Sequence, residues 1–373
     1  MSRPLASVIV TSFNYAQYLA QAIDSALSQT WPAVEVILVD DGSTDASRSV
    51  IDRYAGRVHA IFKPNGGQAS ALNAGFAGSR GEVVLFVDSD DALLPHAVER
   101  VVSAMVDPAM AKVQWRATEI DEGGRSTGRC IPRHELSAGD LRDRVLAKGP
   151  YGYHWPPTSA NAWSRRLLDR ILPMPESEFQ TCPDLYLAAL APLYGRVERV
   201  GEPLSLWRKH SLNQSWREDF VKRVQEGVER DDRTMRAVVE HAQRLGLHPQ
   251  RDRWHAHAWW TQIRAAIADI VSVVPEGGSF ILADQDVWAS GPRIAGRRRV
   301  PFLERHGLYG GPPADDGEAI AELTRQRDDG QRFFVVGFPH LWYLDHYQGL
   351  GVWLRTHARA RLRNDRVAIF ELD

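Results

Sequence analysis

The sequence predicts an α/β protein: a mostly parallel sheet flanked by helices, then a helical segment and a small C-terminal α/β domain. Two observations predict this fold. Apolar strands alternate with segments of helical periodicity over residues 7–88, and a fresh alternation begins after Gly278. Such alternation is typical of parallel strands joined by right-handed crossovers. We therefore expect domains over residues 1–217, 218–275 and 276–373.

The first domain is predicted to contain four strands before residue 90. The helix after the first strand is marked by apolar residues at helical spacing, from Tyr18 to Leu27. Glu82 to Val87 lacks polar alternation, so this strand is expected to be buried on both faces. The predicted strands cover residues 7–10, 34–39, 58–62 and 82–87.

Acidic residues follow two of these strands. Asp40 and Asp41 come after the second strand, and Asp88, Asp90 and Asp91 come after the fourth. The carboxyl ends of strands in an open α/β sheet form the crevice where ligands bind. Carboxylates there suit a hard divalent cation that also bridges phosphate oxygens. The alternative is a polar turn, with Asp91 capping the next helix.

Taken together, these segments resemble the family 2 glycosyltransferases of the GT-A fold, which has a Rossmann-like sheet. The resemblance covers roughly residues 5–215 and rests on the runs SVIVTSFN (7–14), VDDGSTD (39–45), NGGQ (65–68) and FVDSDD (86–91). It implies transfer of a sugar from a nucleotide diphosphate donor to a hydroxyl acceptor, with inversion, in bacterial polysaccharide or glycoconjugate synthesis. The acceptor would be a glycan, a lipid-linked molecule or another hydroxyl compound. A non-catalytic nucleotide-sugar or glycan-binding assembly module is the alternative.

The resemblance also implies roles for single residues. Thr11 and Phe13 would flank the base, and Asp41 would accept a hydrogen bond from it, most naturally from uracil, so a UDP-sugar is expected. Asp88 would lie near the ribose, and Asp90 would ligate Mn²⁺ or Mg²⁺ between the phosphates. Further donor contacts are expected from Asn14, Gln68, Asn73 and Ser89.

Some of these side chains have an equally simple structural use. Asp40 and Asp45 are better explained as turn and cap residues. Asn73 is as suited to bracing a loop as to contacting the donor.

The reaction needs a general base, because the acceptor hydroxyl loses a proton as it attacks. The resemblance makes Asp184 the candidate, although the family pattern has an acid where this chain has Pro183. The alternative is an acid stabilised by the dipole of a helix over 185–193. Glu176 and Glu178 are the other candidates for the base.

The segment from Leu204 to His210 resembles a further family motif. Arg208 would contact the departing diphosphate, and His210 would complete the coordination of the metal. The alternative for His210 is a structural role. Tryptophans gather in the same half of the domain, where they would contact the acceptor sugar or serve packing: Trp155, Trp163, Trp207 and Trp216.

Composition limits the functional class. The 373 residues carry a net charge of −2 and a pI near 6.7, which argues against nucleic-acid binding. The two cysteines lack the spacing of a disulfide or metal-binding framework, which suits a reducing cytosol. Residues 265–274 form the longest apolar stretch, too short to span a bilayer. We expect a cytoplasmic protein without a leader. Residues 254–274 could make a peripheral contact with the inner face of the membrane, but packing in the protein core is the favoured use of their apolar face. The sequence leaves the oligomeric state undecided.

The C-terminal half has its own alternation. Helices are predicted over 218–241, 251–274, 318–327 and 341–358, and strands over 279–283, 333–338 and 367–372. This part loosely resembles C-terminal modules of bacterial polysaccharide-assembly proteins. A scaffolding or oligomer role is preferred over a second site, whose candidate residues are Asp284, Asp286, His340, Asp345 and His346.

Overall fold

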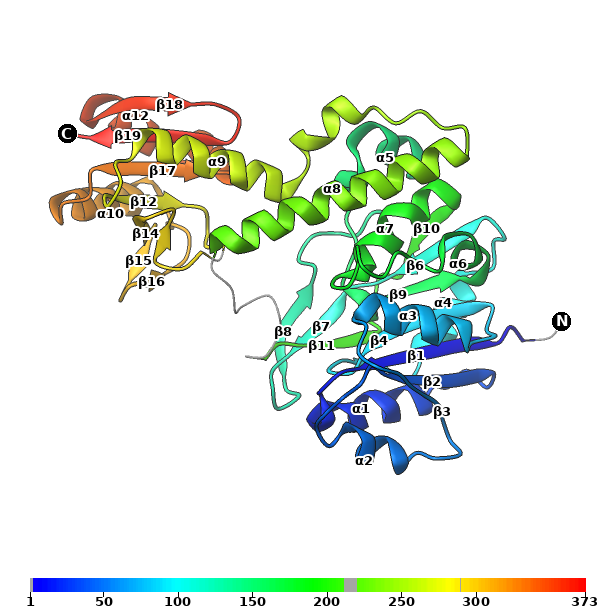
Figure 1. Ribbon diagram of the computed structural model, residues 1–373. Coiled ribbons are helices and arrows are strands. Elements are labelled where there is room, and N and C mark those ends of the chain that lie inside the picture. The colour runs from blue at the N-terminus through cyan, green and yellow to red at the C-terminus, as the bar shows by residue number, and fades with distance from the viewer. Residues whose placement is uncertain (1–2, 211–219, 289) are drawn as a thin grey trace. The chain divides into compact units, whose positions relative to one another are not determined.

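The computed structural model describes residues 3–210, 220–288 and 290–373 (Figure 1). The chain divides into two compact units. The N-terminal unit comprises Met1–Gln214 with Arg233–Trp254, and the C-terminal unit comprises Ser215–Asp232 with His255–Asp373. Helix α8 (Phe220–Arg244) contributes residues to both units. The predicted segment 218–275 is thus divided between them, and its proposed limits remain a prediction.

A seven-stranded sheet forms the centre of the N-terminal unit, in the order β10-β6-β9-β4-β1-β2-β3. Neighbouring strands are parallel except where β9 pairs with β4 and β6. The predicted mostly parallel sheet is therefore confirmed. Its strands are β1 (Ala6–Ser12), β2 (Val34–Asp40), β3 (His59–Phe62), β4 (Val83–Asp88), β6 (Met110–Gln114), β9 (Asn161–Ser164) and β10 (Arg196–Arg199).

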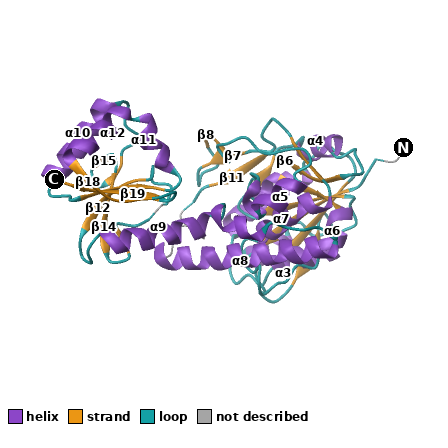
Figure 2. Cartoon of the chain, turned by 90° about the horizontal axis from the view of Figure 1, so that it is seen from above, coloured by secondary structure: helices purple, strands orange, loops and turns teal. Residues whose placement is uncertain are grey.

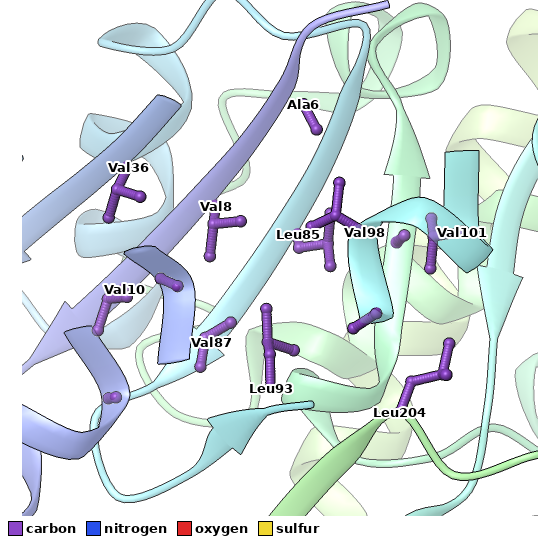
Figure 3. Close-up of a cluster of buried hydrophobic side chains, with 14 of the residues drawn as sticks. Ala6, Val8, Val10, Val36, Leu85, Val87, Leu93, Val98, Val101 and Leu204 are labelled. Atoms are coloured by element: carbon purple, nitrogen blue, oxygen red, sulfur yellow. The ribbon is translucent and has the colours of Figure 1, made fainter. Parts of the chain in front are cut away.

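The helices of this unit cover the sheet because its strands carry apolar side chains on both faces. Val8 and Val10 of β1 lie in one core with Val98 and Val101 of α4 (Figure 3). Ile9 lies on the opposite face, against α3. The helices are α1 (Ala16–Leu27), α2 (Ser47–Asp52), α3 (Gln68–Ala77), α4 (Ala97–Ala104), α5 (Arg142–Lys148), α6 (Arg165–Ile171) and α7 (Pro183–Tyr194).

Close packing of α3 on the sheet depends on a glycine. A Cβ atom added at Gly75 would lie 2.4 Å from Cγ2 of Ile9 and 3.1 Å from Cγ2 of Val39. Any larger residue at position 75 would push α3 away from β1 and β2. Because α3 begins at Gln68, this packing also fixes the position of the Gly66–Gln68 turn.

A small second sheet, which the sequence did not predict, has the order β5-β11-β7-β8. In it, β11 pairs with the short strand that follows Asp91, with Leu206 opposite Ala92. This pairing brings residues 205–210 back to the end of β4. Its strands are β5 (Ala92–Leu93), β7 (Ala117–Ile120), β8 (Ser126–Ile131) and β11 (Ser205–Arg208).

The C-terminal unit contains a six-stranded sheet in the order β13-β14-β12-β17-β19-β18, with helices on both faces (Figure 2). Phe280 and Leu282 of β12 pack with α9 (Trp259–Val273) on one face. Ile281 and Ala283 pack on the other face with α10 (Asp316–Asp328) and α12 (Gln348–His357). The strands are β12 (Ser279–Ala283), β13 (Arg293–Ile294), β14 (Arg297–Pro301), β17 (Phe333–Gly337), β18 (Ala358–Arg363) and β19 (Val367–Leu372), and a two-stranded sheet joins β15 (Glu304–Arg305) to β16 (Leu308–Tyr309).

Two predicted helices of this half are interrupted. The predicted helix 341–358 is wrong as one element: a 3-10 helix (His340–Trp342) and α11 (Tyr343–His346) are separated from α12 at Tyr347, whose φ is −90° and ψ 77°. The predicted helix 251–274 is a 3-10 helix (Arg251–Ala256) followed by α9.

The apolar face of α9 is used for packing. Ile263 and Ala266 are fully buried in the core of the C-terminal unit. Among the residues that the structure describes, no helix combines the length and apolar character needed to cross a membrane.

Candidate functional site

The carboxyl ends of β1, β2 and β4 border a cavity of about 380 Å³, which we call the strand-end cavity. The parallel register sets Thr11 of β1 opposite Asp88 of β4 and opposite Val39 of β2. The acids that follow these strands therefore meet at one edge, as predicted. The lining residues are Thr11, Ser12, Phe13, Tyr15, Asp41, Asn65, Gly67, Gln68, Ala71, Asp88, Ser89, Asp90, Gln180 and Thr181.

Asp41 is almost fully buried at the wall of this cavity. Its Oδ1 atom accepts hydrogen bonds from Nζ of Lys63 at 2.5 Å and from the amide of Gly66 at 3.0 Å. Its Oδ2 atom accepts one from the amide of Gly67 at 2.8 Å. A carboxylate offers about four acceptor positions. One position on Oδ2 therefore remains for a ligand beyond these three bonds.

Asp88 accepts a hydrogen bond from Nε2 of Gln68 at 2.8 Å. Burial, together with the negative charges of Asp90 and Asp184, raises the pKa of Asp88 to about 7. Burial likewise raises the pKa of Asp91, helped by the charges of Asp90 and Asp88. A cation bound at the end of β4 would favour the ionised forms of these carboxyl groups.

Asp90 and His210 are brought together, as the sequence predicted. Nε2 of His210 lies 2.9 Å from Oδ2 of Asp90, and the His210 side chain is fully buried while that of Asp90 is 15% exposed. The His210 ring also contacts Tyr15 and Tyr18, at centroid distances of 5.5 and 5.1 Å. Tyr15 itself lines the cavity.

This pair fits a divalent metal only in part. A carboxylate oxygen and an imidazole nitrogen are suitable donors for such an ion. Within the described ranges, however, no three His, Cys, Asp or Glu side chains are grouped to hold a metal by themselves. Oxygens of a bound diphosphate would have to complete the coordination that Asp90 and His210 begin.

Arg208 does not line the cavity, contrary to its predicted contact with the diphosphate. Its side chain is buried and donates to the carbonyl oxygens of Asp90 (2.9 Å), Asp121 and Glu122 (both 3.1 Å) and to Oε1 of Gln21 (2.6 Å). Its backbone amide donates to Oδ1 of Asp91 at 2.9 Å. At least four of the five guanidinium donors are thus used within the protein. Arg208 therefore fixes the backbone of the Asp90–Asp91 turn.

The two predicted asparagine contacts also brace loops. Oδ1 of Asn14 accepts from the amide of Thr44 at 2.7 Å. Asn73 donates to the carbonyl of Met174 at 3.0 Å and accepts from its amide at 3.0 Å. Neither asparagine lines the cavity. Because their partners lie on distant loops, these side chains hold the cavity's surroundings in place.

The acids with predicted turn or cap roles have them. Asp40 accepts from the amide of Ser43 at 3.3 Å. Asp45 accepts from the amides of Ala16 and Ser47 at 3.0 and 2.9 Å. These bonds tie the loop after β2 to the start of α1.

Asp184 lies in the first turn of α7, behind Pro183 and the left-handed residue Cys182 (φ 58°). Its charge acts on Asp88, which lines the cavity. The two other candidate bases are engaged elsewhere: Glu176 with Asn73 at 3.1 Å, and Glu178 with Arg236 at 3.2 Å. Asp184 does not itself line the cavity, and its role as the general base stays a prediction.

Several residues of the site carry no recognisable signal in the sequence. Tyr15, Gln180 and Thr181 line the cavity, and the last two come from the loop before α7. The predicted acceptor-side role of Trp163 is contradicted by its burial, 1% exposed within β9. Trp155 and Trp207 are half-buried, and Trp216 lies outside the described residues.

The candidate second site of the C-terminal unit is only partly assembled. Asp284 and Asp286 share Arg299, at 3.9 and 2.5 Å. Asp345 and His346 are exposed on α11, whereas His340 is buried. The preferred scaffolding role remains a prediction.

The chain is similar in sequence and structure to known glycosyltransferases. Residues 7–158 match the family model for glycosyl transferase family 2. An uncharacterized glycosyltransferase of Nostoc sp. is 34% identical over 211 residues, 56% of this chain and 65% of the relative. Chondroitin synthase of Pasteurella multocida is 34% identical over 164 residues, 43% of this chain and 16% of the relative. The chain thus spans less than two thirds of these relatives' own lengths.

Solved structures show more distant similarity. S. aureus TarS 1-349 in complex with UDP aligns with a TM-score of 0.45 and 21% identity, covering 64% of this chain and 71% of that one. The mannosyltransferase PcManGT from Pyrobaculum calidifontis, in complex with GDP-Man and Mn²⁺, aligns with a TM-score of 0.45 and 20% identity, covering 74% and 77%.

Proposed function

We propose that the N-terminal unit, whose residues 7–158 match the family model for glycosyl transferase family 2, moves a sugar from a nucleotide diphosphate donor to a hydroxyl acceptor with inversion. The observation that carries the proposal is the pairing of Asp90 with His210 at the edge of the strand-end cavity. Asp90 and His210 would be the two residues that hold a divalent metal here. A bound Mn²⁺ or Mg²⁺ would supply positive charge against the departing diphosphate.

The proposed reaction is one displacement. The acceptor oxygen forms a bond to the anomeric carbon while the bond from that carbon to the diphosphate oxygen breaks. Asp184 takes the hydroxyl proton, and the leaving diphosphate keeps the bonding electrons. The start of α7 stabilises the negative charge that Asp184 needs for this role.

We infer a uracil nucleotide from Asp41. The remaining acceptor position on its Oδ2 atom matches a single ring N–H donor, which the imide of uracil provides. Cytosine has no such ring N–H in its ordinary form. Thr11 and Phe13 line the same cavity and would flank the base.

The acceptor is proposed to be a glycan or a lipid-linked sugar, made on the cytoplasmic side in polysaccharide or glycoconjugate synthesis. The match to a chondroitin synthase over 164 residues supports this class of product.

Nucleotide binding tests the proposal. UDP, GDP, dTDP and CDP are titrated by calorimetry into the full chain, with Mn²⁺ and with EDTA. We expect UDP to bind most tightly and in a metal-dependent way, and Asp90→Ala to abolish the metal dependence. Asp52→Ala, which removes an exposed carboxylate outside the cavity lining, should bind like the wild type. Equal affinities in Asp90→Ala and the wild type would refute the metal site, and tighter GDP binding would reverse the choice of base.

A further inference from the structure

A second cavity of about 220 Å³ is lined by residues of α6, the loop 172–179, α7 and the second half of α8, all within the N-terminal unit. We call it the arginine cavity. Four arginines and two glutamates are among its lining residues: Arg170, Arg233, Arg236, Arg244, Glu178 and Glu240. It is separate from the strand-end cavity, with which it shares no lining residue.

The positive charges of the arginine cavity exceed its negative charges by two. Arg236 pairs with Glu178 at 3.2 Å and Arg244 with Glu240 at 3.9 Å, and all four side chains are substantially exposed. Exposed pairs of this kind contribute little to stability. Their guanidinium groups can therefore turn to a ligand at small cost.

The other two arginines form no ion pair among the described residues. Arg170 lies over the ring of Tyr194, 6.0 Å from its centroid. Arg233 has a buried Nε atom for which the described part of the protein offers no hydrogen-bond partner. A buried donor without a partner costs free energy that a bound acceptor would recover. Arg233 is therefore the arginine of this cavity with a buried donor that a bound anion could satisfy.

His241 forms part of the cavity wall without adding charge. Its ring nitrogens lie 3.2 Å from Oη of Tyr186 and 2.6 Å from Oη of Tyr194. Burial, helped by the charge of Arg244, lowers the pKa of His241 to about 4. The imidazole is thus neutral at pH 7, and the excess charge resides on the guanidinium groups.

We propose that the arginine cavity is a binding site for a phosphoryl group. The guanidinium fork matches phosphate oxygens in a bidentate way. A phosphate monoester near pH 7 carries almost two negative charges, which balances the excess of two positive charges, whereas a carboxylate would leave one uncompensated. The phosphoryl group belongs either to an organic phosphomonoester or to free phosphate.

One short loop, residues 178–181, connects the wall of the arginine cavity to the wall of the strand-end cavity, where the donor is proposed to bind. Glu178 and Phe179 line the arginine cavity, and the next two residues, Gln180 and Thr181, line the strand-end cavity. The carbonyl of Gln180 accepts from the amide of Gln68 at 2.9 Å. A ligand that draws Arg236 away from Glu178 therefore acts on a segment that borders the donor.

Thermal unfolding of the full chain tests the proposal, because a ligand that binds the folded state raises its stability. Sodium phosphate and sodium chloride are compared at equal ionic strength, pH 7.5, with EDTA present to prevent metal-dependent binding beside Asp90. We expect phosphate alone to stabilise the wild type, with a half-maximal concentration at least about tenfold higher in Arg233→Gln, the scale of one lost charge-assisted hydrogen bond. Arg53→Gln, at an exposed arginine after α2, should respond like the wild type, and so should Asp90→Ala.

Equal responses of Arg233→Gln and the wild type, or no difference between phosphate and chloride, would overturn the proposal. Circular dichroism of Arg233→Gln without ligand checks that the variant is folded, and ³¹P NMR line broadening of phosphate repeats the comparison without heating. Glucose 1-phosphate in place of inorganic phosphate separates the two sources: tighter binding of the ester assigns the site to an organic phosphomonoester, and tighter binding of phosphate to the free ion. Both results keep the proposal, and neither depends on sugar transfer.

Discussion

The Nε2 atom of His210 lies 2.9 Å from the Oδ2 atom of Asp90, although the two residues are 120 positions apart in the sequence. The contact exists because β11 returns beside the strand that follows Asp91, with Leu206 opposite Ala92. Arg208 secures this return through its bonds to Asp90 and Asp91. The small second sheet thus completes a site that the large sheet begins.

Replacing Arg208 by Met should destabilise the protein by about 3 kcal/mol or more, because three backbone carbonyls would lose a buried donor at about 1 kcal/mol or more each. Urea unfolding measures this change. Arg53→Met is the matched control, and an exposed substitution should stay within about 0.5 kcal/mol of the wild type. A stable Arg208→Met variant that still binds nucleotide would show that the turn does not depend on this side chain.

Gly67→Ala should weaken both the fold and nucleotide binding. Gly67 has φ of +86°, and an added Cβ would lie 2.3 Å from Cγ and 2.9 Å from the carbonyl oxygen of Gln180. Gly56 has a similar φ of +77° but nothing within 4 Å of the added atom. Gly56→Ala should therefore lower the free energy of unfolding only by the cost of placing alanine in a left-handed backbone conformation, about 1–2 kcal/mol. Calorimetry that finds equal nucleotide affinity in the two variants would argue against the Gly67 contact.

The stability of the C-terminal unit should depend on the ionisation of Asp284. Burial raises the pKa of Asp284 to about 6, despite the opposing charge of Arg299. Because the folded pKa exceeds the ordinary value of 3.8, protonation favours the folded state. The wild type should gain stability relative to Asp284→Asn as the pH falls from about 6 to about 4. Unfolding free energies of both proteins across this range check the sign, and a constant difference would contradict it.

The acids at strand ends were predictable because each directly follows an apolar run. Thr11, Asp41 and Asp88 are placed by the register of three parallel strands, which the alternation of strands and helices already implies. The resemblance of two short motifs to those of the family predicted that Asp90 and His210 would lie at the same site. In these cases local sequence and strand order determine the position.

Other roles depend on contacts that no local pattern records. Asn73 bonds to Met174, 101 residues away, so its bracing role becomes visible only in the fold. Arg208 follows a family-like motif, yet its donors meet carbonyls from two other turns. The helix predicted over 341–358 is broken at Tyr347, because aromatic residues at helical spacing do not reveal such an interruption.

The most direct test of the proposed function is the turnover of Asp184→Asn. Asparagine nearly keeps the shape of the side chain and removes its basicity. On the donor and acceptor that the wild type uses, we predict nucleotide binding within about twofold of the wild type and sugar transfer slower by about 10²–10⁴-fold. Release of nucleotide diphosphate under single-turnover conditions measures the transfer, and calorimetry measures the binding. Near-normal turnover by Asp184→Asn would contradict the account.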